Sequence, residues 1–307
     1  MTDQLSLFPE RDIPKTKEGI ESSDFNALDE MFEANPRFRN SHEYLRILTF
    51  IARFPKYSAL NGLLLYLQNP RATYVATTGT WMKQFDRRPL YDARPMIILA
   101  PMSPVLFLYD LKDTEGETFP DVLLKPTEVK DRIPLEVYER TLDNCRVHGI
   151  DIRSDRTLSD DAPGVVPLTY DRRQSFEGLQ IDPRMKYMII LNEGASLSDK
   201  YTDLVRELAH IFCGHVGIDP LAWWQDRSGI EGQTAELESE SVAFLVSRRR
   251  GLRAASDRLL TRSLPDDRQM PPLGMNCIFH STNYIEQMGK SAWKEPKKGS
   301  RYLPAGR

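Results

Sequence analysis

The segment 204–215 carries residues whose types and spacing could bind and use a metal ion. It contains Glu207 and His210 in the order Glu-x-x-His, the second half of the His-Glu-x-x-His zinc-binding pattern. In that pattern two imidazoles one helical turn apart bind one Zn²⁺, and the glutamate activates the metal-bound water. Here Arg206 occupies the position of the first histidine. An arginine stays protonated and has no lone pair to donate, so it cannot be a metal ligand.

A second acidic segment could supply further ligands to the same metal. Glu236 and Glu240 lie four residues apart and would share one face of a helix, whereas Glu238 would point elsewhere. One of the pair could bind the metal while the other braces a ligand through a hydrogen bond. The alternative is a helix pair whose glutamates are simply solvated. Composition alone does not separate these two interpretations.

The residues around the Glu-x-x-His motif indicate which side of its helix is core. An apolar stripe is formed by Leu204, Leu208, Ile211 and Phe212. The motif residues lie on another side, where a cleft could form. We interpret Cys213, which ends an apolar run, as a buried thiol, and His215 as a capping or core histidine.

The segment 71–94 mixes basic and aromatic residues in a way that suits single-stranded nucleic acid. Its basic residues are Arg71, Lys83, Arg87, Arg88 and Arg94, and its acidic ones are Asp86 and Asp92. Its aromatic residues are Tyr74, Trp81, Phe85 and Tyr91. Basic groups can neutralise phosphates while flat rings stack on bases. The alternative is that Trp81 and Phe85, one helical turn apart, belong to a core and that the arginines form a solvated rim.

Length and composition limit the classes of protein. The chain has 307 residues, enough for two domains, with 28% charged and 40% hydrophobic residues. Its net charge of −3 gives no global signal for nucleic acid. No run of about 18 apolar residues is present, and the polar N-terminus does not read as a signal peptide. Three widely spaced cysteines argue against a disulfide framework, so we expect a cytoplasmic protein without a membrane partner.

Periodicity predicts the elements that would position these residues. The candidate metal site would follow a strand over Lys186–Asn192 and lie on helices over Ser198–Cys213, with Ser198 as N-cap, and Thr234–Arg249. The other elements predicted nearby are a helix over Leu135–Arg146, strands over Gly149–Ile152 and Val165–Tyr170, and a helix over Met275–Met288. The N-terminal part is predicted to hold two helices between Phe25 and Phe54, a helix over Ser58–Gln68, and strands over Tyr74–Ala76, Pro95–Ala100 and Val105–Asp110.

Two parts of the chain each resemble a known protein family. The C-terminal part resembles the ImmA/IrrE family of zinc metallopeptidases in Arg206-Glu207-Leu208-Ala209-His210, in Gly214-His215 and in the acidic helix that follows. The N-terminal part resembles the single-stranded-DNA-binding domain of ArdC-type antirestriction proteins. The residues that carry this second resemblance are Tyr57-Ser58-Ala59-Leu60-Asn61, 68–73, Val75, Trp81, 97–101, Tyr109-Asp110 and 113–116.

The resemblances imply an α+β chain of two domains. The expected divisions are a flexible arm over 1–22, an ArdC-like single-stranded-DNA-binding domain over 23–116, a linker over 117–134, a zincin-like domain over 135–290, and a basic tail over 291–307. The zincin-like domain is expected to hold a small sheet and the long Glu-x-x-His helix. The function implied is binding of single-stranded DNA, in the protection of DNA carried by a mobile element.

The same resemblances imply roles for individual residues. His210 would be a zinc ligand, Glu207 the general base, Glu236 the third ligand, and Glu240 a brace. With Arg206 at the lost ligand position only two protein ligands remain, and zinc affinity should fall by orders of magnitude because a catalytic zinc needs three. The guanidinium could instead fork to Glu207 or Glu236. The implied DNA-binding residues are Lys56, Tyr57, Asn61, Arg71, Trp81, Lys83, Arg87, Arg88 and Arg94.

Two alternative functions stay open on the sequence. One is an active zinc endopeptidase that cleaves a regulatory protein, with zinc as its cofactor and Glu207 taking a proton from metal-bound water. In that interpretation the strand Tyr187–Asn192 would pair with an extended peptide. The other is a peptide-binding module that grips a protein segment without cutting it and needs no cofactor.

Overall fold

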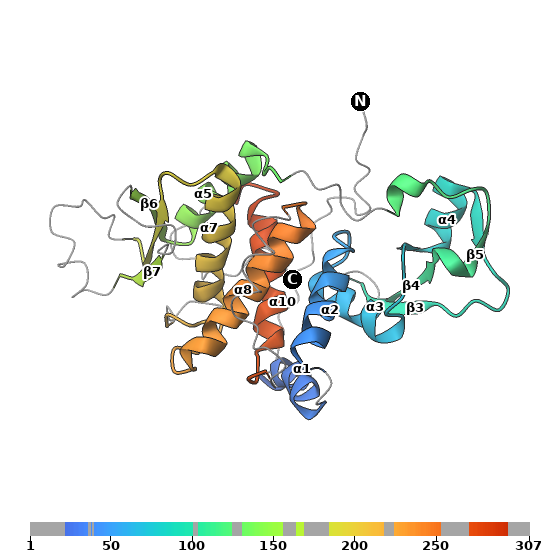
Figure 1. Cartoon of the computed structure of the whole chain (residues 1–307), viewed down its shortest axis with the longest axis horizontal. Helices are drawn as coiled ribbons and strands as arrows, with labels where there is room; N and C mark the ends of the chain where they lie inside the picture. Colours follow the sequence, from blue (N-terminus) through green and yellow to red (C-terminus); the bar gives the residue numbers. More distant parts are fainter. Residues whose placement is uncertain are drawn as a thin grey trace.

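The computed structural model describes residues 22–35, 38, 40–100, 104–124, 131–155, 164–168, 184–217, 224–252 and 270–293. Within these residues the chain is α+β, as predicted, with helices at the centre and small sheets toward both ends (Figure 1). The predicted arm and basic tail fall almost entirely outside the described residues. No helix in the described part is long and apolar enough to cross a membrane.

The C-terminal part is built on a helix that follows a buried strand. Its helices are α5 (Leu135–Val147), α7 (Leu197–Phe212), α8 (Gly232–Arg249) and α10 (Met275–Met288). Its strands are β6 (Ile150–Asp155), β7 (Gly164–Pro167) and β8 (Tyr187–Asn192). The N-cap of α7 is Ser196, whose side chain accepts from Asp199 N, rather than the predicted Ser198. Ser198 instead donates its hydroxyl to the carbonyl of Asp131, which ties the start of α7 to the segment before α5.

The C-terminal sheet has β8 at its centre. β6 pairs with β8 in parallel, from Ile150 opposite Tyr187, and β7 pairs with its other edge in antiparallel register, from Gly164 opposite Ile190. Both edges of β8 are therefore filled. The expectation that a peptide would pair with Tyr187–Asn192 is wrong for this reason. Among the described strands, it is β7 that has an unpaired edge beside α7.

The N-terminal part combines four helices with two small sheets. The helices are α1 (Ser22–Ala34), α2 (Ser41–Ala52), α3 (Ala59–Gln68) and α4 (Thr78–Phe85). One sheet has the order β1 (Val75–Ala76), β4 (Val105–Asp110), β3 (Met96–Leu99), and the other pairs β2 (Arg87–Pro89) with β5 (Thr114–Gly116). Short 3₁₀ turns occupy Leu111–Asp113 and Asp121–Leu123. Periodicity did not identify α4, although Trp81 and Phe85 have helical spacing.

Side-chain amides on α3 complete the edge of β3. The Asn61 carboxamide donates to the carbonyl of Leu99 and accepts from its N–H, both at 3.0 Å. Gln68, two turns later on α3, makes the same pair of bonds with Ile97 at 2.7 Å each. The two amides thus take the place of a neighbouring strand, because alternate residues of β3 present their backbone groups to the same side.

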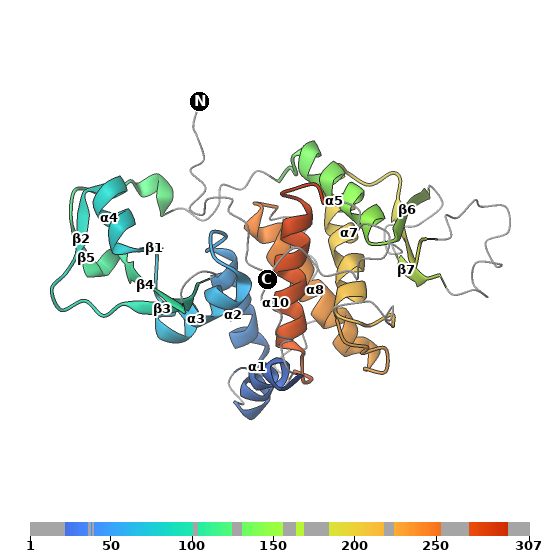
Figure 2. The ribbon, with the colours of Figure 1, turned by 180° about the vertical axis from the view of Figure 1, so that it is seen from behind.

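The first three helices pack against the C-terminal helices. α2 lies beside α8, and α1 and α3 contact α10. Both views show α2 next to the C-terminal helices and α1 at the end of α10 (Figures 1 and 2). One hydrophobic cluster runs from Phe32 in α1 to Met288 in α10. The Tyr44 hydroxyl of α2 donates to Ser241 Oγ of α8 at 2.7 Å in this interior. The division of the chain at 117–134 stays a prediction, and any such division has to account for this shared core.

Candidate functional site

The Glu-x-x-His residues of α7 face α8, and Arg206 lies between two carboxylates. Its Nη2 is 2.9 Å from Glu207 Oε1, and its Nη1 is 3.4 Å from Glu236 Oε2. The sequence left open which glutamate the guanidinium would contact, and in the structure it contacts both. Its side chain is 18% exposed against 4% for Glu207. Water therefore screens this ion pair little, which makes it stronger than a surface pair.

Glu207 is buried on α7 and is poised to titrate near neutral pH. Burial raises the pKa of its carboxyl to about 7. Arg206 opposes this shift, as does the backbone N–H of Val165 on β7, which donates to the carboxylate. Glu207 thus connects the helix to the strand with the open edge.

His210 is held as a neutral imidazole between two elements. Its Nε2 is 3.7 Å from Glu236 Oε1, and its Nδ1 is 3.0 Å from His215 Nδ1. Burial, together with the nearby His215 and Arg206, lowers its pKa to about 3. The resemblance implied that Glu207, His210 and Glu236 lie together, and in the structure these side chains surround Arg206.

A buried carboxylate fixes the tautomers of both histidines. His215 Nε2 is 2.8 Å from Glu238 Oε2. Burial opposes ionisation of Glu238, but hydrogen bonds from Arg227 and His215 outweigh it and lower its pKa to about 2. An ionised Glu238 only accepts, so His215 carries its proton on Nε2 and its Nδ1 accepts from His210. His210 is left with a bare Nε2 lone pair directed toward Glu236, the arrangement typical of a braced metal ligand.

Sequence reasoning missed the residues that do this bracing. Glu238, which was expected to point elsewhere, makes the contact that was predicted for Glu240, and Glu240 lies buried on the same helix. Arg227 forks to both oxygens of Glu238 at 2.5 and 2.7 Å, and Gly274 N donates to Oε1 at 2.6 Å. A Cβ at Gly274 would lie 2.8 Å from Arg227 Nη2, so the close approach there depends on glycine. Nothing in the local sequence around Arg227 signals this role.

The residues present do not fit a catalytic zinc ion. Two donors, His210 Nε2 and a Glu236 oxygen at 3.7 Å from it, are near the separation of roughly 3.3 Å that tetrahedral zinc bonds of 2.0–2.2 Å impose. The third position is a guanidinium already paired with Glu236, which supplies charge of the wrong sign and no lone pair. No chemical step through zinc follows from this arrangement.

The structure corrects one predicted DNA contact outright. Trp81 is fully buried, its indole N–H donates to Tyr109 O at 3.0 Å, and its ring packs against Tyr74, Phe85 and Phe119. A ring without an exposed face has no surface on which a base can stack. The core alternative considered for Trp81 is therefore right.

Other residues predicted to bind DNA make hydrogen bonds within the described part of the fold. Lys56 Nζ donates to the Tyr74 hydroxyl at 3.1 Å, and the Tyr57 hydroxyl donates to Val75 O at 3.0 Å. Asn61 is occupied with β3, as described above. Arg87 joins β2 to β5 through bonds to Thr114 Oγ1 at 3.0 Å and Thr114 O at 2.7 Å.

Four predicted cations and one tyrosine remain at the surface. Arg71, Lys83 and Arg94 are exposed, and Arg88 pairs with Glu115 at 2.9 Å in a solvent-screened contact. Tyr91, between Arg88 and Arg94 in the connection from β2 to β3, is fully exposed. Its ring is an unobstructed platform with basic residues on both sides in sequence.

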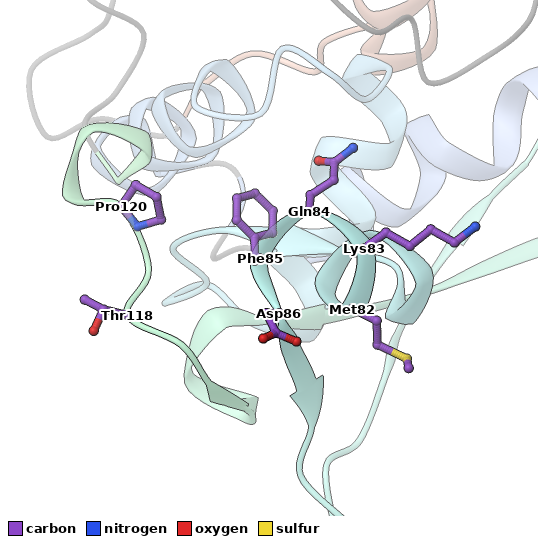
Figure 3. Close-up of a pocket in the computed structure, with 7 residues that line it drawn as sticks. All are labelled: Met82, Lys83, Gln84, Phe85, Asp86, Thr118 and Pro120. Atoms are coloured by element: carbon purple, nitrogen blue, oxygen red, sulfur yellow. The ribbon is translucent and has the colours of Figure 1, made fainter.

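A shallow hollow lies at the end of α4. It has a volume of about 510 Å³ and is lined by Met82, Lys83, Gln84, Phe85, Asp86, Thr118 and Pro120. Figure 3 shows Thr118 and Pro120 on one side and the α4 residues on the other. Lys83 thus belongs both to the exposed cations and to the wall of this hollow.

The comparisons with known proteins give limited likenesses. No protein-family model matches the chain, and no curated protein matches it. The metal-free crystal structure of the antirestriction protein ArdC from plasmid R388 is similar with a TM-score of 0.38 at 12% identity, over 78% of this chain and 87% of that chain. The Mn(II)-bound structure of ArdC gives 0.34 at 12% identity, over 78% and 88%. Likenesses of this size carry no residue-level correspondence, so this chain's own contacts have to support any function.

Proposed function

We propose that the chain is a single-stranded-DNA-binding protein of the ArdC type. In this proposal residues 23–116 bind DNA, 117–134 link them to a zincin-like domain over 135–290, and Arg206 has closed the zinc site of that domain. The single observation that carries DNA binding is Tyr91, a fully exposed ring between Arg88 and Arg94. The role would be to cover DNA of a mobile element during transfer.

The surface chemistry determines what kind of binding to expect. Tyr91 would stack on a base, and Arg88, Arg94 and Lys83 would contact phosphates. Asp86 and Asp92 are exposed in the same region and repel the backbone. We therefore expect binding that is sequence-tolerant and strongly weakened by salt.

The experiment is a fluorescence-anisotropy titration of the full chain with labelled oligothymidylate at several salt concentrations. We expect Tyr91→Ser to weaken binding by about 1–3 kcal/mol, the usual contribution of one stacked base. Lys83→Ala and Arg94→Ala should each reduce the slope of log K against log salt by about 0.7, because each removes one phosphate contact.

The matched control is Arg146→Ala, which removes an equally exposed arginine on α5. It should leave both affinity and salt slope unchanged. Equal affinity of the unaltered chain and Tyr91→Ser, or equal losses in Tyr91→Ser and Arg146→Ala, would refute the assignment of this surface.

A specific observation favours a second function, peptide binding without cleavage. The outer edge of β7 has no partner strand in the described part, and Glu207 lies beside it through the Val165 N–H. An extended peptide can add to such an edge. Incubating the chain with a library of peptides and analysing bound and free fractions by mass spectrometry tests this. Retention of uncleaved peptides would support this function, and cleavage of the peptides or the absence of any retained peptide would refute it.

A further inference from the structure

Behind the two histidines lies a cluster of sulfur and carboxylate ligands that the proposed functions leave unused. It consists of Cys213 at the C-cap of α7, Glu238 on α8 and Cys277 in the first turn of α10. One donor atom from each of these residues lies within 4.8 Å of the others. The cluster is thus formed where three helices meet and draws no ligand from the Arg206 site.

The contacts of Arg227 mark the place where this cluster holds positive charge. Its Nη1 is 2.5 Å from Glu238 Oε2, 2.8 Å from Cys277 Sγ and 3.4 Å from Cys213 O. A single cationic nitrogen therefore touches the carboxylate, one sulfur and the backbone of the residue that carries the other sulfur. The Arg227 side chain is 21% exposed while that of Glu238 is fully buried, so the guanidinium is the member that can withdraw toward solvent.

We propose that Cys213, Glu238 and Cys277 form a binding site for a thiophilic divalent cation such as Zn²⁺, and that Arg227 occupies this site until the ion displaces it. Thiolate and carboxylate donors suit Zn²⁺, Co²⁺ and Cd²⁺ better than Mg²⁺ or Ca²⁺. The separation of Cys277 and Glu238 agrees with this. Zinc bonds of about 2.3 Å to sulfur and about 2.0 Å to oxygen place S and O roughly 3.5 Å apart in a tetrahedron, and Cys277 Sγ is 3.5 Å from Glu238 Oε2.

The proton and charge balance is also satisfied. Each thiol gives its proton to solvent as its sulfur bonds to the ion, so two protons leave when one divalent ion enters. Two thiolates and Glu238 then carry one negative charge more than the ion neutralises, and the displaced Arg227 nearby offsets it. The fourth coordination position is left to water, because the Nε2 of His215 carries the proton that it donates to Glu238.

The test uses Co²⁺ as the probe, because thiolate-bound cobalt gives an intense near-ultraviolet charge-transfer band. The full chain, kept reduced with a phosphine, is titrated with Co²⁺ and then with competing Zn²⁺. We expect a band at one Co²⁺ per chain that Zn²⁺ abolishes. Cys213→Ser and Cys277→Ser should each lose most of it, whereas Cys145→Ser, which removes a buried thiol outside the cluster, should retain it.

Two further variants separate this site from its neighbours. Arg227→Gln removes the competing cation and should bind Co²⁺ about tenfold more tightly, the size of effect that neighbouring groups have on metal sites. Glu236→Gln should leave the band unchanged, because Glu236 belongs to the Arg206 site. Circular dichroism confirms that each variant is folded, and the alanine variant of the same cysteine replaces any serine variant that is not.

Several results would overturn the proposal. One is the absence of a charge-transfer band in the reduced, unaltered chain. Another is a band of equal strength in Cys213→Ser and Cys277→Ser. Cobalt binding that gives no charge-transfer band and is lost in Glu236→Gln would place the ion at the other site, which has no sulfur donor. The untreated chain could also have a mass two hydrogens below that of the reduced chain, with no cobalt binding after reduction. That result would show that Cys213 and Cys277 form a disulfide instead of a metal site.

Discussion

At the residue scale, one arginine determines the chemistry of the α7–α8 site. Arg206 holds Glu207 and Glu236 together with a fixed positive charge, where a metal ligand would need a lone pair. His210 is nevertheless held by a hydrogen bond to His215, which in turn bonds Glu238, as the histidine ligand of a metal is usually held. In the function proposed above, Arg206 closes the site, while His215 and Glu238 still brace His210.

Replacing Arg206 by histidine should open this site to zinc. A histidine adds a third donor beside His210 and Glu236 and removes the competing guanidinium, so affinity should rise by orders of magnitude. The measurement is zinc per chain by elemental analysis, made in a Cys277→Ser background so that the cysteine cluster does not contribute. Equal zinc content in this background with and without Arg206→His would contradict the interpretation that Arg206 closes the site. As a further control, adding Glu236→Gln to the Arg206→His variant should remove the zinc.

Glu207 should make folding stability fall as pH rises toward neutrality. Its pKa is raised from 4.5 to about 7 in the native state, so between these values the folded chain holds a proton that the unfolded chain has lost. The stability from this group is present below pH 4.5 and lost as pH passes 7, a change of roughly 3 kcal/mol.

Denaturant unfolding at pH 5 and pH 8 checks this. The free energy of unfolding of Glu207→Gln should rise relative to that of the unaltered chain as pH rises. His210, whose pKa is lowered to about 3, acts in the opposite sense and destabilises the fold as pH falls below 6.5. A constant difference between Glu207→Gln and the unaltered chain across this range would contradict the assigned pKa.

At the element scale, α3 serves as a surrogate strand for β3. Asn61 and Gln68 satisfy backbone groups that an edge strand otherwise exposes. The Asn61 amide is therefore needed to complete the edge of β3, and this role involves no contact to DNA.

Asn61→Ala should cost stability rather than DNA affinity. Removing two partly exposed hydrogen bonds should lower the free energy of unfolding by about 1–2 kcal/mol, since water replaces them only in part. Gln68→Ala should behave alike, and Gln84→Ala, an exposed amide on α4 outside this edge, should cost almost nothing. Denaturant unfolding measures the stability of each variant, and fluorescence anisotropy with oligothymidylate measures its DNA affinity. A loss of DNA affinity without loss of stability would restore Asn61 as a DNA contact.

At the scale of the whole molecule, a buried arginine ties the N-terminal helices to the C-terminal ones. Arg249 at the end of α8 donates to Glu286 on α10 at 2.6 Å and to Tyr57 O at 2.6 Å. It also reaches Ile51 O and Phe54 O at 3.3 and 3.4 Å, at the C-terminal end of α2. One cation thus adds hydrogen bonds to carbonyls at and just after the end of α2, two of which also accept from backbone N–H groups.

Arg249→Met should destabilise the whole chain by about 3–5 kcal/mol, because it leaves Glu286 as an unpaired buried charge. The double variant Arg249→Met, Glu286→Leu should recover part of this loss. Thermal unfolding followed by circular dichroism should show the N-terminal helices and the C-terminal helices melting together. The control Arg146→Met removes an exposed arginine of α5 whose partner Asp143 is also exposed, and it should change little. Two separate transitions would instead show that the parts fold independently.

The sequence by itself determined the long helices and their contents. The 3.6-residue period suffices for α7, α8 and α10, and the spacing of the motif was enough to place Glu207 and His210 on successive turns of one helix. Lone-pair chemistry alone excluded Arg206 as a ligand. Each of these inferences needs only local geometry or the properties of a single side chain.

Tertiary structure decided what depends on residues far apart in the chain. Only packing could bury Trp81 and assign Asn61 and Arg87 to strand edges, because an exposed and a buried aromatic have the same sequence signal. Only packing could bring Arg227 and Cys277 to Glu238, and Arg249 to the carbonyls after α2. Contacts of this kind join segments separated by up to about two hundred residues, and no local period encodes them; they arise because buried polar groups must find partners wherever the fold places them.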